Sequence, residues 1–384
     1  MSVVAPFGFE AAGVSAGIKK PGEKDLAVVA AAGPVAAAGI FTRNRSAAAP
    51  VLLSRHHLRD HQARAIVLNS GCANAGTGSA GEKAALAMAQ ATAEGLGCRV
   101  PDVLVASTGP IGPPLPIDSI CNAIPDAIGA LNDQSGTEAA TAIMTTDTVN
   151  KEATSVGSGY VIGGMAKGAA MVRPDMATML AVLTTDAVLS WQALETMLRR
   201  VGDKTFNCLN IDGCPSTNDS VFLLASGAAG VRPDLEEFEQ RLHDVCLDLA
   251  LQMARDGEMT DRVITVNVRG AVNDAIAREI GRTMTDSDLV RASFYGGDPN
   301  WGRLLAAAGA GPFPVNPNAM TVSYNGVEVA RNSVQLDYAR NALLATLRQG
   351  DFSVDVEVGT GEGQATIYAC DLTPGYVTFN SEPS

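Results

Sequence analysis

The segment 163–186, GGMAKGAAMVRPDMATMLAVLTTD, is the part of the sequence on which its interpretation depends most. Small residues around Lys167 lead to the sequence PDMAT at 174–178, and an apolar run, MLAVL, follows it. Threonine is common in strands, so Thr178 can be interpreted as the first residue of a buried strand. It can also be interpreted as a nucleophile, because a threonine at a newly formed N-terminus can use its own α-amine as general base. Composition alone does not choose between these interpretations.

The chain has only four histidines, which leaves little material for a serine–histidine or cysteine–histidine mechanism. His56, His57 and His61 lie in one short polar segment, SRHHLRDHQAR. The spacing of His57 and His61 could suit two metal ligands on a helix, but no third ligand accompanies them, so we expect a solvated helix surface and no metal site. His243 falls beside the apolar face of an amphipathic helix, where we expect a structural histidine with its hydrogen bonds satisfied. A covalent enzyme of this sequence would therefore use another base.

Helix-like and strand-like segments are mixed along the chain, without a repeat period and without a linker-like stretch. Apolar side chains three and four residues apart predict a helix over 234–256, bounded by Pro233 and Gly257, and an alanine-rich run predicts another over 83–96. Asn325-Gly326 between alternating runs predicts a hairpin at 320–329. Short apolar or alternating runs predict strands at 65–69, 103–107, 262–268, 351–358 and 364–370. The pattern indicates an α+β or layered α/β chain with mixed sheets.

Composition limits the classes of function. The 384 residues are 46% hydrophobic and 18% charged, which is typical of a globular protein with two or three domains. A net charge of −13 disfavours nucleic acid and membrane surfaces as partners. The apolar stretch 26–41 is too short for a bilayer and is interrupted by Gly33-Pro34. No secretory signal is visible, and the seven cysteines lack a C-x-x-C pair, so we expect a cytoplasmic protein with reduced thiols.

Residues 76–81, GTGSAG, match the pattern G-x-G-x-x-G between a predicted strand and a predicted helix. A dinucleotide-binding fold places the first glycine almost directly after the strand and an acidic residue at the end of the next strand. Here six residues separate Asn69 from Gly76, and the next strand ends in Ala106-Ser107. A glycine-rich loop is therefore the better interpretation. A dinucleotide-binding oxidoreductase remains an alternative from another class.

The sequence resembles the ornithine acetyltransferase family, also called the bifunctional glutamate N-acetyltransferases of arginine biosynthesis. The resemblance covers nearly the whole chain, and its motifs occur in the family's order. They are GFEAAGVSAGIK at 8–19, FTRN at 41–44, LNSGCANA at 68–75, STGPIG at 107–112, IMTTDT at 143–148, MAKGAAMVRPDMATML at 165–180, IDGCPSTND at 211–219 and GGDPNWGR at 296–303.

The resemblance implies an activity. Members of the family cleave themselves at an Ala-Thr bond, here Ala177-Thr178, and the new N-terminal threonine becomes the catalytic nucleophile. This would give an α chain of residues 1–177 and a β chain of residues 178–384. The family moves acetyl from N-acetylornithine to glutamate through an acetyl-threonine intermediate, with no cofactor. Some members also acetylate glutamate from acetyl-CoA, which is therefore a candidate co-substrate.

The resemblance also implies the site residues. Thr108 and Gly109 match the pair that stabilises the oxyanion, and a hydroxyl with a backbone N–H after a strand suits that role. The positions that match substrate contacts, together with the nucleophile Thr178, are Thr145, Lys167, Glu258, Asn380 and Ser384. A lysine with hydroxyl and amide donors is the expected pocket for substrates that carry an α-carboxylate and an acylated amine.

Two stretches depart from the family's pattern. Residues 256–262 read DGEMTDR where the family usually has DGEGATK, so Glu258 is kept but Met259 and Asp261 change its surroundings. The tail NSEPS at 380–384 is one residue shorter than usual and lacks an aromatic residue. Of the residues carried over, Ser384 is therefore the one that the family's pattern supports least.

The fold that the resemblance implies is a layered α/β sandwich of the N-terminal-nucleophile type with a smaller C-terminal domain. It also implies a heterotetramer of two α and two β chains. A self-cleaving aminopeptidase or amidase of the same fold, in which water takes the acyl group, is the alternative within the enzymes. A non-catalytic metabolite-binding protein is a further alternative, which failure of the chain to cleave would favour.

Overall fold

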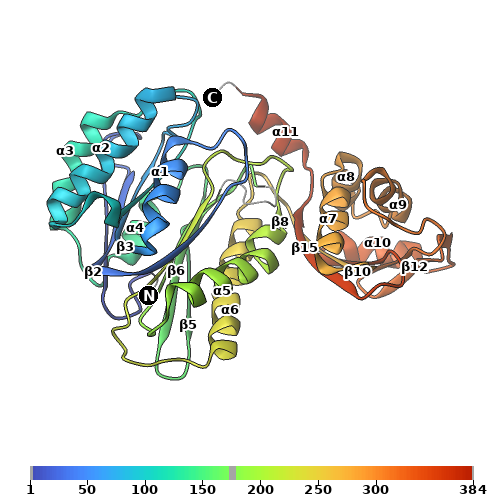
Figure 1. The fold of residues 1–384 in the computed structure, drawn as a ribbon. Helices are drawn as coiled ribbons and strands as arrows, with labels where there is room; N and C mark the ends of the chain where they lie inside the picture. Colours follow the sequence, from blue (N-terminus) through green and yellow to red (C-terminus); the bar gives the residue numbers. More distant parts are fainter. Residues whose placement is uncertain (1–2, 173–178, 383–384) are drawn as a thin grey trace. The chain divides into compact units, whose positions relative to one another are not determined.

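The computed structural model describes residues 3–172 and 179–382, and in it two mixed sheets belong to two different units (Figure 1). The first unit comprises Met1–Gly168, Asp175–Phe206 and Pro215–Met253, and the second comprises Ala169–Pro174, Asn207–Cys214 and Ala254–Ser384. The chain passes between the units several times, which explains why its sequence contains no linker-like stretch. The second unit corresponds to the smaller C-terminal region expected from the sequence.

The sheet of the first unit has the strand order β4-β3-β2-β9-β7-β6-β5, and β1 pairs with β2. Its strands are β1 (Phe9–Val14), β2 (Leu26–Phe41), β3 (Gln62–Ser70), β4 (Val103–Thr108), β5 (Lys151–Val156), β6 (Val161–Lys167), β7 (Leu180–Thr185) and β9 (Ser220–Ala225). β3 and β4 run parallel, as do β7 and β9, whereas β2 is antiparallel to both β3 and β9. The sheet is therefore mixed, as the sequence pattern indicates.

The apolar stretch 26–41 forms the long strand β2. Its first half pairs with β1 and β3, and its second half pairs with β9. The register shifts between Ala30 and Val35, where Gly33-Pro34 interrupts the regular pairing. No helix in the described part of the chain is both long and apolar enough to cross a membrane.

Helices cover both faces of the first sheet. They are α1 (Ala49–His57), α2 (Gly78–Leu96), α3 (Ile117–Gly129), α4 (Gly136–Ala142), α5 (Trp191–Lys204) and α6 (Leu235–Arg255). Alternate residues of a strand point to opposite faces, so Val28 and Val67 pack with α2 and α3 whereas Val29 and Leu68 pack on the side of α4. The result is the layered α/β arrangement expected from the sequence, with the predicted helix 234–256 confirmed as α6.

The sheet of the second unit has the order β13-β12-β11-β14-β10-β15-β8. Its strands are β8 (Leu209–Asn210), β10 (Val263–Ala271), β11 (Thr321–Tyr324), β12 (Val327–Arg331), β13 (Val334–Gln335), β14 (Phe352–Glu357) and β15 (Gly363–Cys370). Its helices are α7 (Asp274–Thr285), α8 (Asp288–Gly296), α9 (Trp301–Ala310), α10 (Arg340–Leu347) and α11 (Pro374–Ser381). Alternate residues of β10, such as Val266, pack against α7–α10, while Thr265 and Asn267 are only partly buried and Arg269 is exposed.

The predicted strands and the hairpin are confirmed in this unit. Asn325 and Gly326 both have positive φ, 46° and 77°, which is the backbone that a tight two-residue hairpin turn requires. β14 and β15 follow one another in sequence, yet they are not neighbours, because β10 lies between them, parallel to β14 and antiparallel to β15. Sequence patterns identify strands, and pairing over long distances in the sequence decides their order.

Two expectations need correction. The helix predicted over 83–96 begins earlier, at Gly78, because Gly81 has no side chain and so lets Thr77 and Asn74 pack against the first turn. The histidine segment is a solvated helix surface only in part: His56 is exposed, but His57 is buried, its ring Nδ1 lies 2.7 Å from the Val103 carbonyl, and burial lowers its pKa. His61 lies beyond the helix and stacks on Trp191, with 3.6 Å between ring centroids.

Candidate functional site

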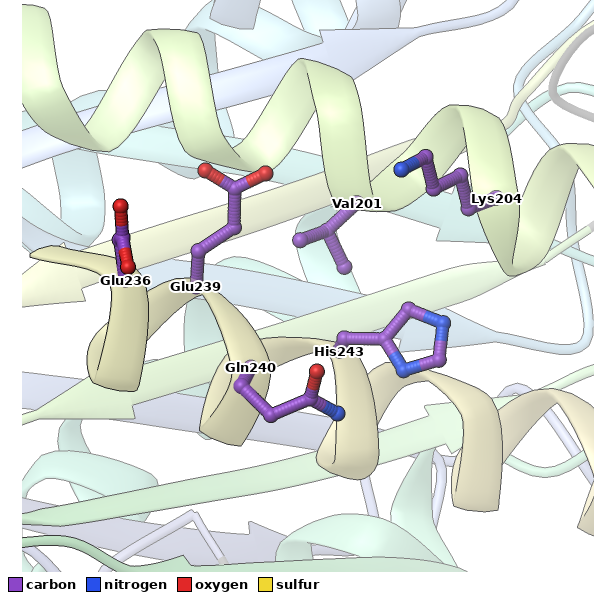
Figure 2. Close-up of a pocket in the computed structure, with 6 residues that line it drawn as sticks. All are labelled: Val201, Lys204, Glu236, Glu239, Gln240 and His243. Atoms are coloured by element: carbon purple, nitrogen blue, oxygen red, sulfur yellow. The ribbon is translucent and has the colours of Figure 1, made fainter. Parts of the chain in front are cut away.

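A surface hollow of about 280 Å³ lies between α5 and α6 (Figure 2). It is lined by Val201, Lys204, Glu236, Glu239, Gln240 and His243. None of the residues predicted for the active site is among them. His243 is only partly buried; its Nδ1 lies 4.0 Å from a carboxylate oxygen of Asp244 and makes no hydrogen bond in the described part of the chain, so this nitrogen does not meet the expectation of a satisfied structural histidine. Among all residues that the structure describes, no three His, Cys, Asp or Glu side chains lie close enough together to bind a metal ion.

The predicted oxyanion pair lies where β4 ends. Thr108 is the last residue of β4 and is buried, and it forms an isolated backbone bridge with Cys72. Gly109 has a φ of 138°, and a Cβ added there would come within 2.5 Å of the backbone nitrogen of Cys72. Only glycine fits such a close approach of two backbone segments. The local structure therefore explains why a glycine follows Thr108 and why the loop can present its backbone N–H.

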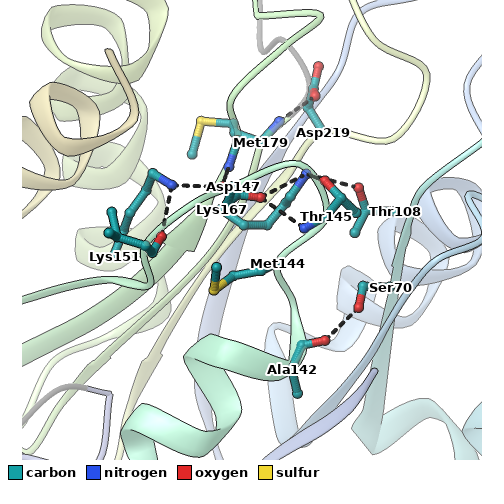
Figure 3. Close-up of polar contacts among 12 residues, drawn as sticks. Ser70, Thr108, Ala142, Met144, Thr145, Asp147, Lys151, Lys167, Met179 and Asp219 are labelled. Atoms are coloured by element: carbon teal, nitrogen blue, oxygen red, sulfur yellow. Dashed lines mark hydrogen bonds and ion pairs between the residues drawn. The ribbon is translucent and has the colours of Figure 1, made fainter. Parts of the chain in front are cut away.

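Lys167 contacts two of the other predicted residues (Figure 3). It is the last residue of β6, its side chain is buried, and its Nζ donates hydrogen bonds to the Oγ1 of Thr145 at 2.6 Å and the Oγ1 of Thr108 at 3.3 Å. These residues come from segments far apart in the sequence. Because the Thr108 oxygen accepts a hydrogen bond from the ammonium group, its own hydroxyl proton can point to another acceptor. That is the arrangement an oxyanion donor needs.

Asp147 holds this cluster in place. Its carboxylate lies 2.7 Å from the Nζ of Lys151 and 3.7 Å from the Nζ of Lys167, and it accepts backbone N–H bonds from Gly168 at 2.7 Å and Thr145 at 2.9 Å. Burial raises the pKa of this carboxyl, but the charges of Lys167 and Lys151 outweigh burial and hold the pKa well below its ordinary value. Asp147 is therefore ionised and fixes both Lys167 and the loop that carries Thr145.

Sequence reasoning did not single out Asp147 or Lys19. The Nζ of Lys19 donates to the carbonyl of Met144, the residue before Thr145, and to the carbonyl of Lys24 at 3.0 Å. Burial lowers the pKa of Lys19, against the opposing charge of Asp25. Both lysine and aspartate lie in motifs that carry the family resemblance, GFEAAGVSAGIK and IMTTDT, which is the signal that could have identified them.

The second unit brings together Glu258 and Asn380. The Nδ2 of Asn380, on α11, donates to the Glu258 carboxylate at 3.1 Å, and the backbone N–H of Glu258 donates to the carbonyl of Ala169 at 2.9 Å. Met259, at a position where the family usually has glycine, has a φ of 51°, in the left-handed region. The turn after Glu258 therefore keeps a backbone that suits glycine although this sequence has a methionine there. Ala177, Thr178 and Ser384 lie outside the described residues.

The G-x-G-x-x-G stretch has a structural explanation. Residues 71–77 separate β3 from α2, and Gly78 and Gly81 are already part of the helix. The side chain of Asn74 donates to the Gly81 carbonyl at 2.9 Å, and the hydroxyl of Thr77 donates to Asn74 at 2.8 Å. A Cβ on Gly81 would overlap with Thr77. Packing of the preceding loop against the helix thus accounts for Gly81 without a dinucleotide.

Comparison with known proteins agrees with these motifs and this fold. The model of the ArgJ family matches residues 10–383. The arginine biosynthesis bifunctional protein ArgJ of Thermobifida fusca is 46% identical over 383 residues, covering 99% of both chains, and that of Streptomyces coelicolor is 43% identical over 382 residues, also covering 99% of both.

The crystal structure of the arginine biosynthesis bifunctional protein ArgJ from Bacillus halodurans is similar to part of this chain. It has a TM-score of 0.50 and 34% sequence identity, and the match covers 52% of this chain and 96% of that one. This likeness confirms the mixed α/β fold. With the family model matching nearly all of the sequence, the chain belongs to the ArgJ family.

Proposed function

We propose that this chain transfers acetyl from N-acetylornithine to glutamate through an acetyl ester on Thr178. In the first half, the threonine oxygen attacks the acetyl carbon, the C–N bond to ornithine breaks, and the hydroxyl proton passes through the α-amine to the leaving amine. In the second half, the glutamate amine attacks the ester, the C–O bond breaks, and a proton returns to the threonine. Arginine biosynthesis, the role named for the relatives, is the corresponding pathway.

The observation that carries the proposal is the contact of Lys167 with both Thr108 and Thr145. It supports an oxyanion site made by the Thr108 hydroxyl and the Gly109 N–H beside a substrate site made by Thr145 and Lys167. A preorganised donor in a buried, low-dielectric position stabilises a developing negative charge more than water does. Glu258 and Asn380 would bind the amino-acid part of the substrate together with Ser384.

Self-cleavage at Ala177-Thr178 is the second part of the proposal. The strands on either side of this bond, β6 and β7, are antiparallel neighbours, with Lys167 paired to Leu180. Fragments 1–177 and 178–384 would therefore share one sheet, since β7 and β9 of the second fragment pair with β6 and β2 of the first. Hydrogen bonding and core packing across that sheet would keep the fragments together.

Four finer points complete the proposal. The protein is cytoplasmic, it assembles as a heterotetramer of two α and two β chains, and it needs no cofactor. Acetyl-CoA is a second acetyl donor, in line with the bifunctional activity named for the relatives.

The test is intact mass and acetyl transfer on the purified protein. We expect two fragments, 1–177 and 178–384, under denaturing conditions and formation of N-acetylglutamate from N-acetylornithine and glutamate. Thr178→Ala should remain a single chain without transferase activity, whereas Thr178→Ser should still cleave because it keeps a hydroxyl nucleophile. An active enzyme that stays uncleaved would contradict the mechanism, and release of acetate without transfer to glutamate would favour the amidase alternative.

A further inference from the structure

Asn218 occupies a buried position at the end of the motif IDGCPSTND, to which the proposed mechanism gives no role. Its Nδ2 donates to two carbonyls, that of Ala73 at 2.6 Å and that of Ser107 at 2.9 Å. Its Oδ1 accepts from the hydroxyl of Thr217 at 2.5 Å. Both donors and the acceptor of the side-chain amide are thus used, which fixes the orientation of the side chain.

The two carbonyls that Asn218 binds flank the predicted oxyanion pair. Ser107 precedes Thr108, and Ala73 follows Cys72, whose backbone lies against Gly109. One side chain therefore ties together the end of β4 and the loop on which it packs.

Asp219, the next residue, makes a corresponding contact with Met179, at the start of the described part of the chain after residue 178. Its buried carboxyl accepts from the backbone N–H of Met179 at 2.9 Å (Figure 3), and the backbone N–H of Ser220 donates to the carbonyl of Met179 at 3.2 Å. The backbone nitrogen of Met179 is covalently bonded to the carbonyl carbon of Thr178. Asp219 therefore holds the backbone N–H of the residue that follows the proposed nucleophile in the sequence.

We infer that Asn218 and Asp219 are a pair of positioning residues that hold the oxyanion donors in register with Met179, the residue that follows the proposed nucleophile in the sequence. The inference rests on the proposed function and deepens it. The two adjacent residues form hydrogen bonds with Ser107 near the end of β4 and with Met179, the residue before β7. Because Asn218 and Asp219 are joined by one peptide bond, the end of β4 and Met179 cannot easily move relative to each other. Reacting groups misplaced by about 1 Å can lose ~10²-fold in rate.

The acceptor role does not need a charge on Asp219. Burial raises the pKa of this carboxyl well above its ordinary value, against the opposing hydrogen bond from the Met179 N–H. A neutral carboxyl still offers a carbonyl oxygen to Met179, and the amide of asparagine has nearly the same shape and offers the same acceptor. Asp219→Asn is therefore the conservative variant, whereas Asp219→Ala removes the acceptor.

The experiment compares four variants with wild type by intact mass, thermal unfolding and steady-state kinetics. Asp219→Ala and Asn218→Ala should slow self-cleavage and lower kcat by ~10²-fold, with KM for N-acetylornithine changed by less than about threefold. Asp219→Asn should keep kcat within about tenfold of wild type. Ser54→Ala is the matched control: the Ser54 hydroxyl bonds with the backbone of Val105 in β4, so this variant should lose stability and retain its kcat.

The possible outcomes distinguish failure of the proposed function from failure of the positioning role alone. Wild-type protein that neither cleaves nor transfers acetyl overturns the proposed function, and the positioning role with it. An active wild type with Asp219→Ala and Asn218→Ala near wild-type kcat, or with losses that merely follow their stability as in Ser54→Ala, overturns the positioning role alone. If the alanine variants fail to fold, a folded but inactive Asp219→Asn also overturns it.

Discussion

Two groups of predicted site residues are held in different ways. In the first unit, Lys167 is buried, donates hydrogen bonds to Thr108 and Thr145, and forms an ion pair with Asp147. In the second unit, Asn380 is exposed on the last helix and reaches Glu258 through one hydrogen bond of 3.1 Å. The first group is preorganised before any substrate arrives, because buried charges must be paired and are costly to rearrange. The second can reorient at little cost.

The difference follows from where the residues lie in the fold. Thr108 and Lys167 end two strands of one sheet, and the pairing of that sheet positions their backbones. Glu258 lies in a turn after α6, and α11 buries none of its residues. We therefore expect the bond-making steps, which need exact geometry, to use the residues at the strand ends. We expect Glu258 and Asn380, which can adjust their positions, to recognise the amino-acid part of the substrate. The predictions below test this contrast.

The largest effect is expected on stability at Asp147. Asp147→Asn removes a carboxylate that pairs with two buried lysines, and breaking a buried ion pair in this way costs about 3–5 kcal/mol. Chemical denaturation at pH 7 measures the loss. The matched control is Glu328→Gln, which breaks the exposed pair with Arg331 and should lower the free energy of unfolding far less, because solvent screens an exposed pair. Equal losses in the free energy of unfolding would show that the buried pair contributes no more to stability than the exposed pair.

The stability contributed by Asp147 should depend on pH. Its pKa is lower in the folded protein than in the unfolded chain, so the ionised form favours folding and its contribution is complete above the unfolded pKa. It is lost as the pH falls through the acid range. The difference between wild type and Asp147→Asn should therefore shrink below about pH 4. A difference that stays constant down to pH 3 would contradict this assignment.

The next largest effect concerns catalysis at Thr108. Thr108→Ala should lower kcat by about 10²–10³-fold with a much smaller change in KM, because an oxyanion donor acts on charge that develops only in the transition state. Thr108→Ser keeps the hydroxyl and should keep most of the activity. Thr92→Ala, which removes a buried hydroxyl bonded within α2, is the control for stability alone. A folded, cleaved Thr108→Ala with near wild-type kcat would exclude Thr108 from the oxyanion site.

A smaller effect is expected at Asn380. Asn380→Ala removes one exposed hydrogen bond to Glu258, so KM should rise by a factor that corresponds to about 0.5–1.5 kcal/mol, with kcat little changed. Ser381→Ala on the same helix loses only a bond to the Thr378 carbonyl and serves as control. A fall in kcat comparable to that of Thr108→Ala would show that the second group is as exacting as the first.

The smallest effect is expected at Met259. Its left-handed backbone costs an L-residue about 1–2 kcal/mol, part of which glycine loses again through the greater freedom of the unfolded chain. Met259→Gly should therefore raise the free energy of unfolding by up to about 1 kcal/mol. Thermal unfolding measures it, and a clear loss of stability would indicate that packing of the methionine side chain outweighs the strain.

The sequence determined much of this protein by itself. Local patterns were enough for the helix at Leu235–Arg255, the hairpin around Asn325-Gly326 and the strands β10, β14 and β15 of the second sheet, because helix periodicity, strand alternation and turn chemistry depend on neighbouring residues. The short strands β8 and β13 were not predicted. The family motifs were enough to identify the acetyltransferase family and to nominate Thr108 and Lys167, since such motifs record residue types in order.

Only the tertiary structure decided which of these residues meet. Strand pairing between distant segments places β10 between β14 and β15. It also brings His57 to the Val103 carbonyl of β4 and Lys167 to Thr108. Asp147, Lys19 and the pair Asn218–Asp219 gained their roles in the same way. No local propensity encodes such contacts, because they form only when sheet register and core packing bring separate parts of the chain together.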